Sequence, residues 1–191
     1  LQCRGIDATH EGTPGDDVIN GTGGDDVIVG AGGNDTINGL GGNDLICARG
    51  GNDIVDGGPG DDMIFGGSGD DTLTGGSGND TIIGQLGTDI LVGSQGDDTL
   101  KGDRGDDTIS GHTGNDTLAG HDGEDTLSGG GHDDTLRGGD DNDMLSGGNG
   151  DDLLIGGTGD DTLTGDSGTD EARGWTGIDT CSAEIIRTCE L

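Results

Sequence analysis

Aliphatic residues recur at every ninth position through most of this chain. From Gly12 to residue 182 the sequence divides into nineteen nonapeptides without insertion or deletion. If the positions of each nonapeptide are numbered 1 to 9, position 8 is Val, Ile or Leu in seventeen, and the exceptions are Ala172 and Cys181. Since side chains alternate along a strand, positions 7 to 9 predict a short strand with one inward side chain.

Glycine has an equally regular place in the repeat. Position 1 is Gly in eighteen repeats, with Ala48 as the exception, and position 4 is Gly in seventeen, with His132 and Asp141 as exceptions. Glycine permits backbone angles that are closed to other residues, so we expect positions 1 to 6 to form a turn. The two exceptions at position 4 predict weak points in repeats 14 and 15.

A turn plus a short strand reverses the chain once, so two nonapeptides make one coil of 18 residues. Odd repeats then stack on one edge and even repeats on the other, with the position-8 residues of two sheets meeting in a thin aliphatic layer. At a strand spacing of ~4.8 Å, the coils form a rod roughly 45 Å long. The pattern predicts an all-β fold, a parallel two-sheet β-solenoid.

Composition and charge agree with a thin core and exclude several partners. The chain has 48 glycines, one Phe, one Trp and no Tyr, which leaves little material for a thick core. Forty acidic residues, 35 of them Asp, face seven basic ones, for a net charge of −33. We therefore expect no binding to nucleic acid or anionic membranes, and no stretch is long enough to span a bilayer. The charge points to cations.

Position 6 is Asp in all nineteen repeats, which makes it the candidate metal ligand. Stacked coils bring these carboxylates to ~5 Å from one another, where they repel. Calcium takes about six to eight oxygens from carboxylates and carbonyls, and glycine-rich turns expose carbonyls; magnesium fits less well because it keeps its waters. The turns leave nine gaps on one edge and eight on the other, so at most about 17 calcium ions are expected. Their total positive charge would be close in size to the negative charge of the chain.

Without calcium we expect a largely unfolded chain, because burying one aliphatic side chain per repeat does not offset the entropy cost of ordering nine residues. The candidate ligands are Asp17, Asp26, Asp35, Asp44, Asp53, Asp62, Asp71, Asp80, Asp89, Asp98, Asp107, Asp116, Asp125, Asp134, Asp143, Asp152, Asp161, Asp170 and Asp179.

Gly66 to Thr74, read Gly-Gly-Ser-Gly-Asp-Asp-Thr-Leu-Thr, is a well-formed copy. It resembles the RTX, or hemolysin-type, calcium-binding repeat. The resemblance covers residues 12 to 182 and implies a right-handed parallel β-roll, with calcium held between turn n and turn n+2 by position-6 carboxylates and turn carbonyls. It also implies secretion by a bacterium and folding in extracellular calcium. Well-known members carry an effector domain before the repeats and usually lack cysteine; here eleven residues precede the repeats and the chain has four cysteines.

The cysteines and the chain ends carry further expectations. Four cysteines near the ends suggest an oxidising compartment, and with Leu1 as first residue we expect a chain processed by removal of an N-terminal signal. We predict disulfides Cys3–Cys47 and Cys181–Cys189, against free thiols or the other two pairings. We expect an N-terminal cap over residues 1–11, the roll over 12–173 and a C-terminal cap over 174–191.

Catalysis is not expected. There is no His-Glu-x-x-His motif, and His112 and His121 fall at position 2 of consecutive repeats, hence on opposite edges. We therefore expect a monomeric, secreted calcium-binding protein that serves as an extracellular structural, adhesive or spacer module. The alternatives are an ice-binding β-roll with an outward Thr row, or the C-terminal repeat piece of a larger secreted enzyme or toxin. The sequence does not identify the extracellular partner.

Overall fold

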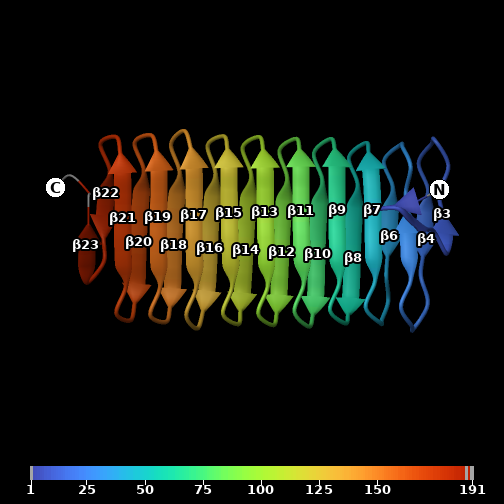
Figure 1. Ribbon diagram of the computed structural model, residues 1–191, viewed down its shortest axis with the longest axis horizontal. Coiled ribbons are helices and arrows are strands. Elements are labelled where there is room, and N and C mark those ends of the chain that lie inside the picture. Colours follow the sequence, from blue (N-terminus) through green and yellow to red (C-terminus); the bar gives the residue numbers. More distant parts are fainter. Residues whose placement is uncertain (1, 188, 190–191) are drawn as a thin grey trace.

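The protein is a straight rod of stacked coils, seen in a computed structural model that describes residues 2–187 and 189. Figure 1 shows strands side by side along the whole rod, with the N-terminal segment at one end and the C-terminal segment at the other. Every regular element is a strand, and none of the described residues forms a helix that could cross a bilayer. The predicted all-β parallel solenoid is confirmed.

Two parallel sheets face each other, and the chain alternates between them. The eleven-stranded sheet contains β3 (His10–Glu11), β5 (Val27–Val29), β7 (Leu45–Gly50), β9 (Met63–Ser68), β11 (Thr81–Leu86), β13 (Thr99–Arg104), β15 (Thr117–Asp122), β17 (Thr135–Asp140), β19 (Leu153–Thr158), β21 (Glu171–Thr176) and β23 (Ile185–Arg187). The ten-stranded sheet contains β4 (Val18–Asn20), β6 (Thr36–Asn38), β8 (Ile54–Pro59), β10 (Thr72–Ser77), β12 (Ile90–Gln95), β14 (Thr108–Thr113), β16 (Thr126–Gly131), β18 (Met144–Asn149), β20 (Thr162–Ser167) and β22 (Thr180–Ser182).

The register places each residue beside its equivalent two repeats away. Leu73 pairs with Val55 on one side and with Leu91 on the other, each 18 residues distant. The coil of two repeats is therefore confirmed. Position-8 side chains from both sheets fill the space between them, and from Ile28 to Ala172 they are almost completely buried. Each coil adds only two such side chains, so the hydrophobic layer is thin.

The strands are longer than the sequence predicted. Most run over six residues, from position 7 of one repeat to position 3 of the next, so the expected turn over positions 1 to 6 is wrong and only positions 4 to 6 lie outside strands. Positive φ angles occur at position 4, as expected, but also at position 2, for example at Gln85 and Ser94. Position 1 has no positive φ. There, glycine is required by close approach: a Cβ on Gly57 would overlap both the Asp62 Oδ2 and the Gly75 carbonyl oxygen.

The N-terminal segment folds back over the outer face of the eleven-stranded sheet. Strands β1 (Gln2–Cys3) and β2 (Ile6–Asp7) form an antiparallel hairpin that projects beside the rod, while β3 joins the sheet. Cys3 is bonded to Cys47, with 5.7 Å between their Cα atoms, and is buried with Val29 and Phe65 in a small apolar cluster outside the roll. The Arg4 guanidinium lies 5.1 Å from the Phe65 ring centroid.

The C-terminal end is closed by different residues. The second predicted disulfide, Cys181–Cys189, is also present. Strand β23 pairs with β21, and the Asp170 amide donates a hydrogen bond of 3.0 Å to Glu184 Oε2. Glu184 therefore accepts, at this end, the backbone hydrogen bond that a position-6 Asp of the next coil accepts elsewhere. Since β3 and β22 join the two sheets, both ends continue the stack; the division at residues 11 and 173 stays a prediction.

The position-4 exceptions of repeats 14 and 15 predict a measurable weakness. His132 and Asp141 have φ angles of 82° and 74°, in the left-handed region that favours glycine. At the neighbouring Gly123 and Gly150, an added Cβ would overlap the carbonyl of the preceding coil. We expect His132→Gly and Asp141→Gly each to stabilise the calcium-loaded protein by about 1 to 3 kcal/mol, measured by denaturant unfolding.

Gln95→Gly is the matched control, since Gln95 is exposed and has no positive φ, so added glycine should slightly destabilise the protein there. Hydrogen exchange under limiting calcium should show residues 129–146 opening before repeats 5 to 9. If that segment exchanges last, the weakness does not exist.

Candidate metal sites along the two edges

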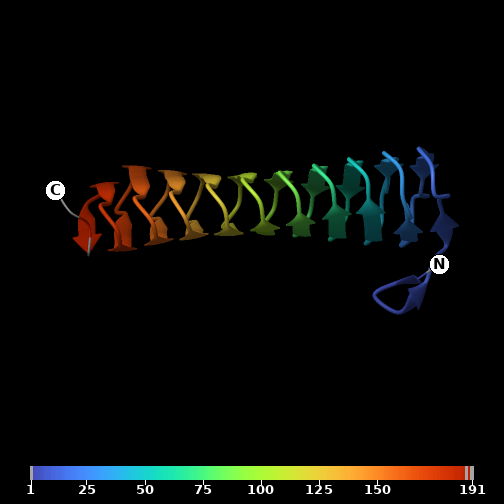
Figure 2. The same ribbon diagram turned by 90° about the horizontal axis from the view of Figure 1, so that it is seen from above.

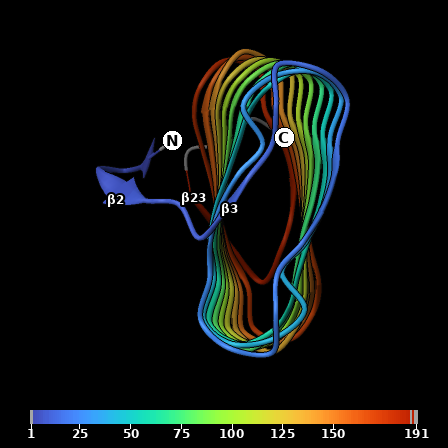
Figure 3. The same cartoon turned by 90° about the vertical axis from the view of Figure 1, so that its right-hand side faces the viewer.

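The position-6 aspartates form two buried rows, one along each edge of the rod. The turns lie at the two narrow ends of the oval cross-section in Figure 3. Eighteen of the nineteen predicted ligands are buried, from Asp26 at 6% exposure to Asp170 and Asp89 at 0%; Asp17, in the first turn, is partly exposed. The fold thus takes a row of carboxylates out of water, which is costly for an ionised group unless it is paired.

Only one oxygen of each interior carboxylate has a protein partner. Oδ1 accepts a hydrogen bond from the position-6 amide of the preceding coil, as in Asp80 N–H to Asp98 Oδ1 at 2.8 Å. The other oxygen is buried without a hydrogen-bond partner in seventeen aspartates, namely Asp35, Asp44, Asp53, Asp62, Asp71, Asp80, Asp89, Asp98, Asp107, Asp116, Asp125, Asp134, Asp143, Asp152, Asp161, Asp170 and Asp179. A buried polar atom left unpaired costs free energy, and repeated seventeen times it requires an explanation.

Glycine at position 1 leaves room beside these unpaired oxygens. The point where Gly39 would carry a Cβ is faced by the Asp44 Oδ2 and by the Gly57 carbonyl oxygen of the next coil. The same arrangement recurs at Gly66, with the Asp71 Oδ2 and the Gly84 carbonyl. A carboxylate oxygen and a carbonyl oxygen converging on one small space are the ligand types that calcium takes.

Burial raises the pKa of the interior aspartates. It raises that of Asp71, Asp80 and Asp143 to about 7, against a hydrogen bond from the neighbouring coil's amide that lowers it. Position-6 carboxylates of the same edge raise it further: for Asp80 these are Asp98 and Asp62. Asp17 differs, because hydrogen bonds from the Thr13 amide and hydroxyl lower its pKa. In the interior rows, burial and like charge therefore disfavour the ionised carboxylates unless a cation compensates them.

These residues fit calcium in donor type. Among the described residues, no three His, Cys, Asp or Glu side chains converge on one point. A cation between two turns would therefore use the position-6 carboxylates and complete its shell with turn carbonyls. Calcium accepts such oxygen-only shells of irregular shape, and magnesium does so less readily.

A second row, at position 5, was not foreseen from the sequence. Its side chains accept hydrogen bonds in the opposite direction: Asn79 N–H donates to Asp61 Oδ1 of the preceding coil at 2.8 Å, while Asp80 N–H donates forward to Asp98. Each turn is thus tied to both neighbours. The signal was present, since position 5 is Asp or Asn in fifteen of nineteen repeats.

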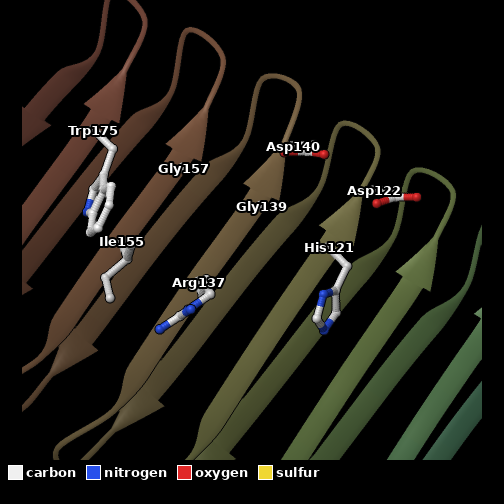
Figure 4. A pocket seen from close by; sticks show the side chains of 8 residues that line it. All are labelled: His121, Asp122, Arg137, Gly139, Asp140, Ile155, Gly157 and Trp175. Carbon is white, nitrogen blue, oxygen red and sulfur yellow. The ribbon is translucent and has the colours of Figure 1, made fainter.

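The outer face of the eleven-stranded sheet carries most of the basic residues. Arg49, Lys101, Arg104, Arg137 and Arg173 belong to its strands, and Arg4 lies over it in the hairpin. A shallow hollow of about 370 Å³ lies on this face. Figure 4 shows the side chains that line it, which come from successive strands: His121, Asp122, Arg137, Gly139, Asp140, Ile155, Gly157 and Trp175. Its lining includes both acidic and basic side chains, two aspartates and one arginine, and we assign it no ligand. His112 and His121 belong to different sheets, as predicted.

The fold and the rows of turn carboxylates define a repeat β-solenoid of the calcium-binding type. A family model that describes four copies of the RTX calcium-binding nonapeptide repeat matches five segments of the chain, residues 11–46, 48–82, 83–118, 110–145 and 146–181. These matches span most of the chain, so it belongs to the RTX calcium-binding repeat family, whose repeats bind calcium. Comparison with curated proteins finds no match.

The raised pKa values predict an unusual pH dependence for the calcium-free chain. An aspartate with a pKa of 3.8 when exposed and about 7 in the folded roll takes up a proton on folding between these values. Folding is then favoured as pH falls and disfavoured as pH rises through 7. We expect calcium-stripped protein to gain strand signal in far-UV circular dichroism between pH 8 and pH 5. The gain should persist at high salt, which screens exposed charges; strand signal that increases with pH would contradict it.

The register predicts which aspartates are energetically coupled. Asp80 contacts Asp98 through its amide, whereas Asp89 contacts Asp107 on the other edge. We expect Asp80→Asn and Asp98→Asn to be strongly non-additive in the calcium midpoint of folding, with a coupling of about 0.5 to 3 kcal/mol, and Asp80→Asn with Asp89→Asn to be closer to additive. A double-mutant cycle measures both. Stronger coupling in the 80/89 pair would rule out shared sites between turns 18 residues apart.

Proposed function

We propose that this protein is a secreted module that folds on binding many calcium ions at its turns, and that it serves outside the cell as a structural, adhesive or spacer element. The observation that carries the proposal is the set of seventeen buried carboxylate oxygens without a hydrogen-bond partner, in two rows along the edges of the rod. The position-6 aspartates would be the carboxylate ligands, with turn carbonyls beside them. Two disulfides are compatible with an extracellular location.

A module of this kind needs no active site. Its rigidity would come from the sheet ladders, and its charge would be neutralised by the bound cations. Because metal binding to the folded state alone adds directly to its stability, the chain would be extended and soluble where calcium is scarce and would become a rod where calcium is abundant. We propose that it acts as a monomer, without catalysis.

Calcium titration tests this proposal. We expect coil-like far-UV dichroism in excess chelator and a cooperative gain of strand signal at millimolar calcium, with a much smaller response to magnesium, because magnesium gives up its waters reluctantly. Asp80→Asn should shift the calcium midpoint upward, while Asp103→Asn, an acid on a sheet face, should leave it nearly unchanged. A fully formed roll in chelator would defeat the proposal.

Ice binding is a second candidate, favoured by how position 7 divides between the sheets. On the ten-stranded sheet these outward residues align in one row and carry no charge, whereas Leu45, Met63, Leu153 and Glu171 fall on the other sheet. The row is Val18, Thr36, Ile54, Thr72, Ile90, Thr108, Thr126, Met144, Thr162 and Thr180. Regular methyl and hydroxyl groups on a flat face could order water.

Thermal hysteresis distinguishes the two candidates. If the protein binds ice, Thr108→Arg in the ten-stranded face should abolish hysteresis, and Thr117→Arg, at the equivalent exposed position of the other sheet, should not. An absence of hysteresis in the calcium-loaded wild type would eliminate this candidate and leave the structural module.

A further inference from the structure

The first two turns of the roll are built differently from the other seventeen. Their position-2 residues are Thr13 and Thr22, and no other repeat has Thr at this position. The Thr13 amide and hydroxyl donate to Asp17 Oδ2 at 2.6 and 2.8 Å, and those of Thr22 donate to Asp26 Oδ2 at 2.7 and 2.9 Å. The carboxylate oxygen that is unpaired in every later repeat is doubly satisfied here.

The backbone of these two turns differs in the same way. From repeat 3 onward, position 2 always has a positive φ, whether it is Gly76 at 121° or Ser94 at 90°. Thr13 and Thr22 have no positive φ, so the amide of each can point at the position-6 carboxylate of its own repeat. A β-branched residue is poorly suited to positive φ, so Thr at position 2 favours the turn in which its amide and hydroxyl bond to the carboxylate.

The opposite side of Asp26 is also occupied by the chain itself. Thr9 Oγ1 donates to Asp26 Oδ1 at 3.1 Å, and His10 Nδ1 lies 3.4 Å from the same oxygen. Only the short strand β3 precedes Asp26 in this sheet, and at Asp26 Oδ1 the Thr9 hydroxyl stands where later repeats have a backbone amide. Both oxygens of Asp26 therefore have protein partners.

We infer that Asp17 and Asp26 are not calcium ligands, and that the first two turns are a metal-independent end of the roll closed by Thr13 and Thr22. This inference rests on the proposed function, since it concerns which turns take calcium. A cation at either turn would have to displace two donors from the carboxylate. The gaps between turns 1 and 3 and between turns 2 and 4 would then hold no calcium, so the protein would bind two ions fewer than its seventeen gaps allow.

The inference gives the N-terminal end a physical role. Stacked repeats need an end that does not depend on a further repeat. At this end the side-chain hydroxyls replace the missing coil and the missing cation, and the Cys3–Cys47 disulfide fixes the chain against β7. Calcium-loaded coils can then add to a preformed first coil.

Counting bound calcium by native mass spectrometry at saturating calcium tests the inference. We expect Asp26→Asn to keep the wild-type number of ions, because its oxygens hold donors and no metal, and Asp80→Asn to bind one fewer. Loss of an ion in both variants would overturn the inference. If the wild type binds no calcium, or Asp80→Asn loses none, the proposed function fails instead, so the two failures are distinguishable.

A second variant tests whether calcium sites appear at the first two turns when the threonines are removed. Thr13→Gly with Thr22→Gly removes the hydroxyl donors and installs the residue found at position 2 of many calcium-type turns, such as Gly76. We expect this variant to bind one or two ions more than the wild type. Ser94→Gly is the matched control: Asp98 Oδ2 in that repeat has no donor to lose, so the count should not change. An unchanged count in the double variant would overturn the inference.

Discussion

Parallel stacking at a fixed spacing forces each residue of this protein to lie beside its own equivalent in the next coil. For position 8 this is favourable, since aliphatic side chains pack in a continuous layer from Ile28 to Ala172. For position 6 it is not, because the same geometry lines up carboxylates and buries them. Stacking therefore stabilises the hydrophobic layer and at the same time brings like charges together, and these buried carboxylates need a counter-ion. The other features of the turns follow from this requirement.

The turns resolve half of the conflict with protein atoms alone. Forward hydrogen bonds to position 6 and backward hydrogen bonds to position 5 tie each turn to two neighbours, as seen for Asn79 and Asp80. These bonds hold one oxygen of each position-6 carboxylate and leave the other unsatisfied over a position-1 glycine. Glycine is therefore needed at position 1 because a Cβ would overlap the oxygens there, and at position 4 because the backbone has a positive φ. At the two ends, where a neighbour is missing, Thr9, Thr13, Thr22 and Glu184 supply the substitute contacts.

Much of this architecture could be predicted because the repeat multiplies every signal nineteen times. The coil of two repeats, the buried row at position 8 and both disulfides follow from spacing and from the placement of Cys3 and Cys181 near the ends. The extension of each strand through position 3 could not be seen, because Gly76 and its equivalents indicate a turn in any local analysis, and only pairing with the next coil makes them strand. The role of position 5 was missed since side chains such as Asn79 look like ordinary turn residues until the direction of their hydrogen bonds is known. The special character of Asp17 and Asp26 was hidden because both match the repeat, and only the contacts of Thr13 and Thr22 separate them from the other seventeen.

The most direct test of the central claim, that the stacked carboxylates cannot be buried without a cation, is the size of the molecule with and without calcium. Small-angle X-ray scattering at neutral pH gives the radius of gyration in both states. For 191 residues an unfolded chain should give about 47 Å and a compact rod below about 20 Å. The account predicts the larger value in chelator, a fall to the smaller one in calcium, and little change in magnesium. A radius below about 20 Å in chelator at neutral pH would show that the protein buries its rows of aspartates unaided, and would contradict it.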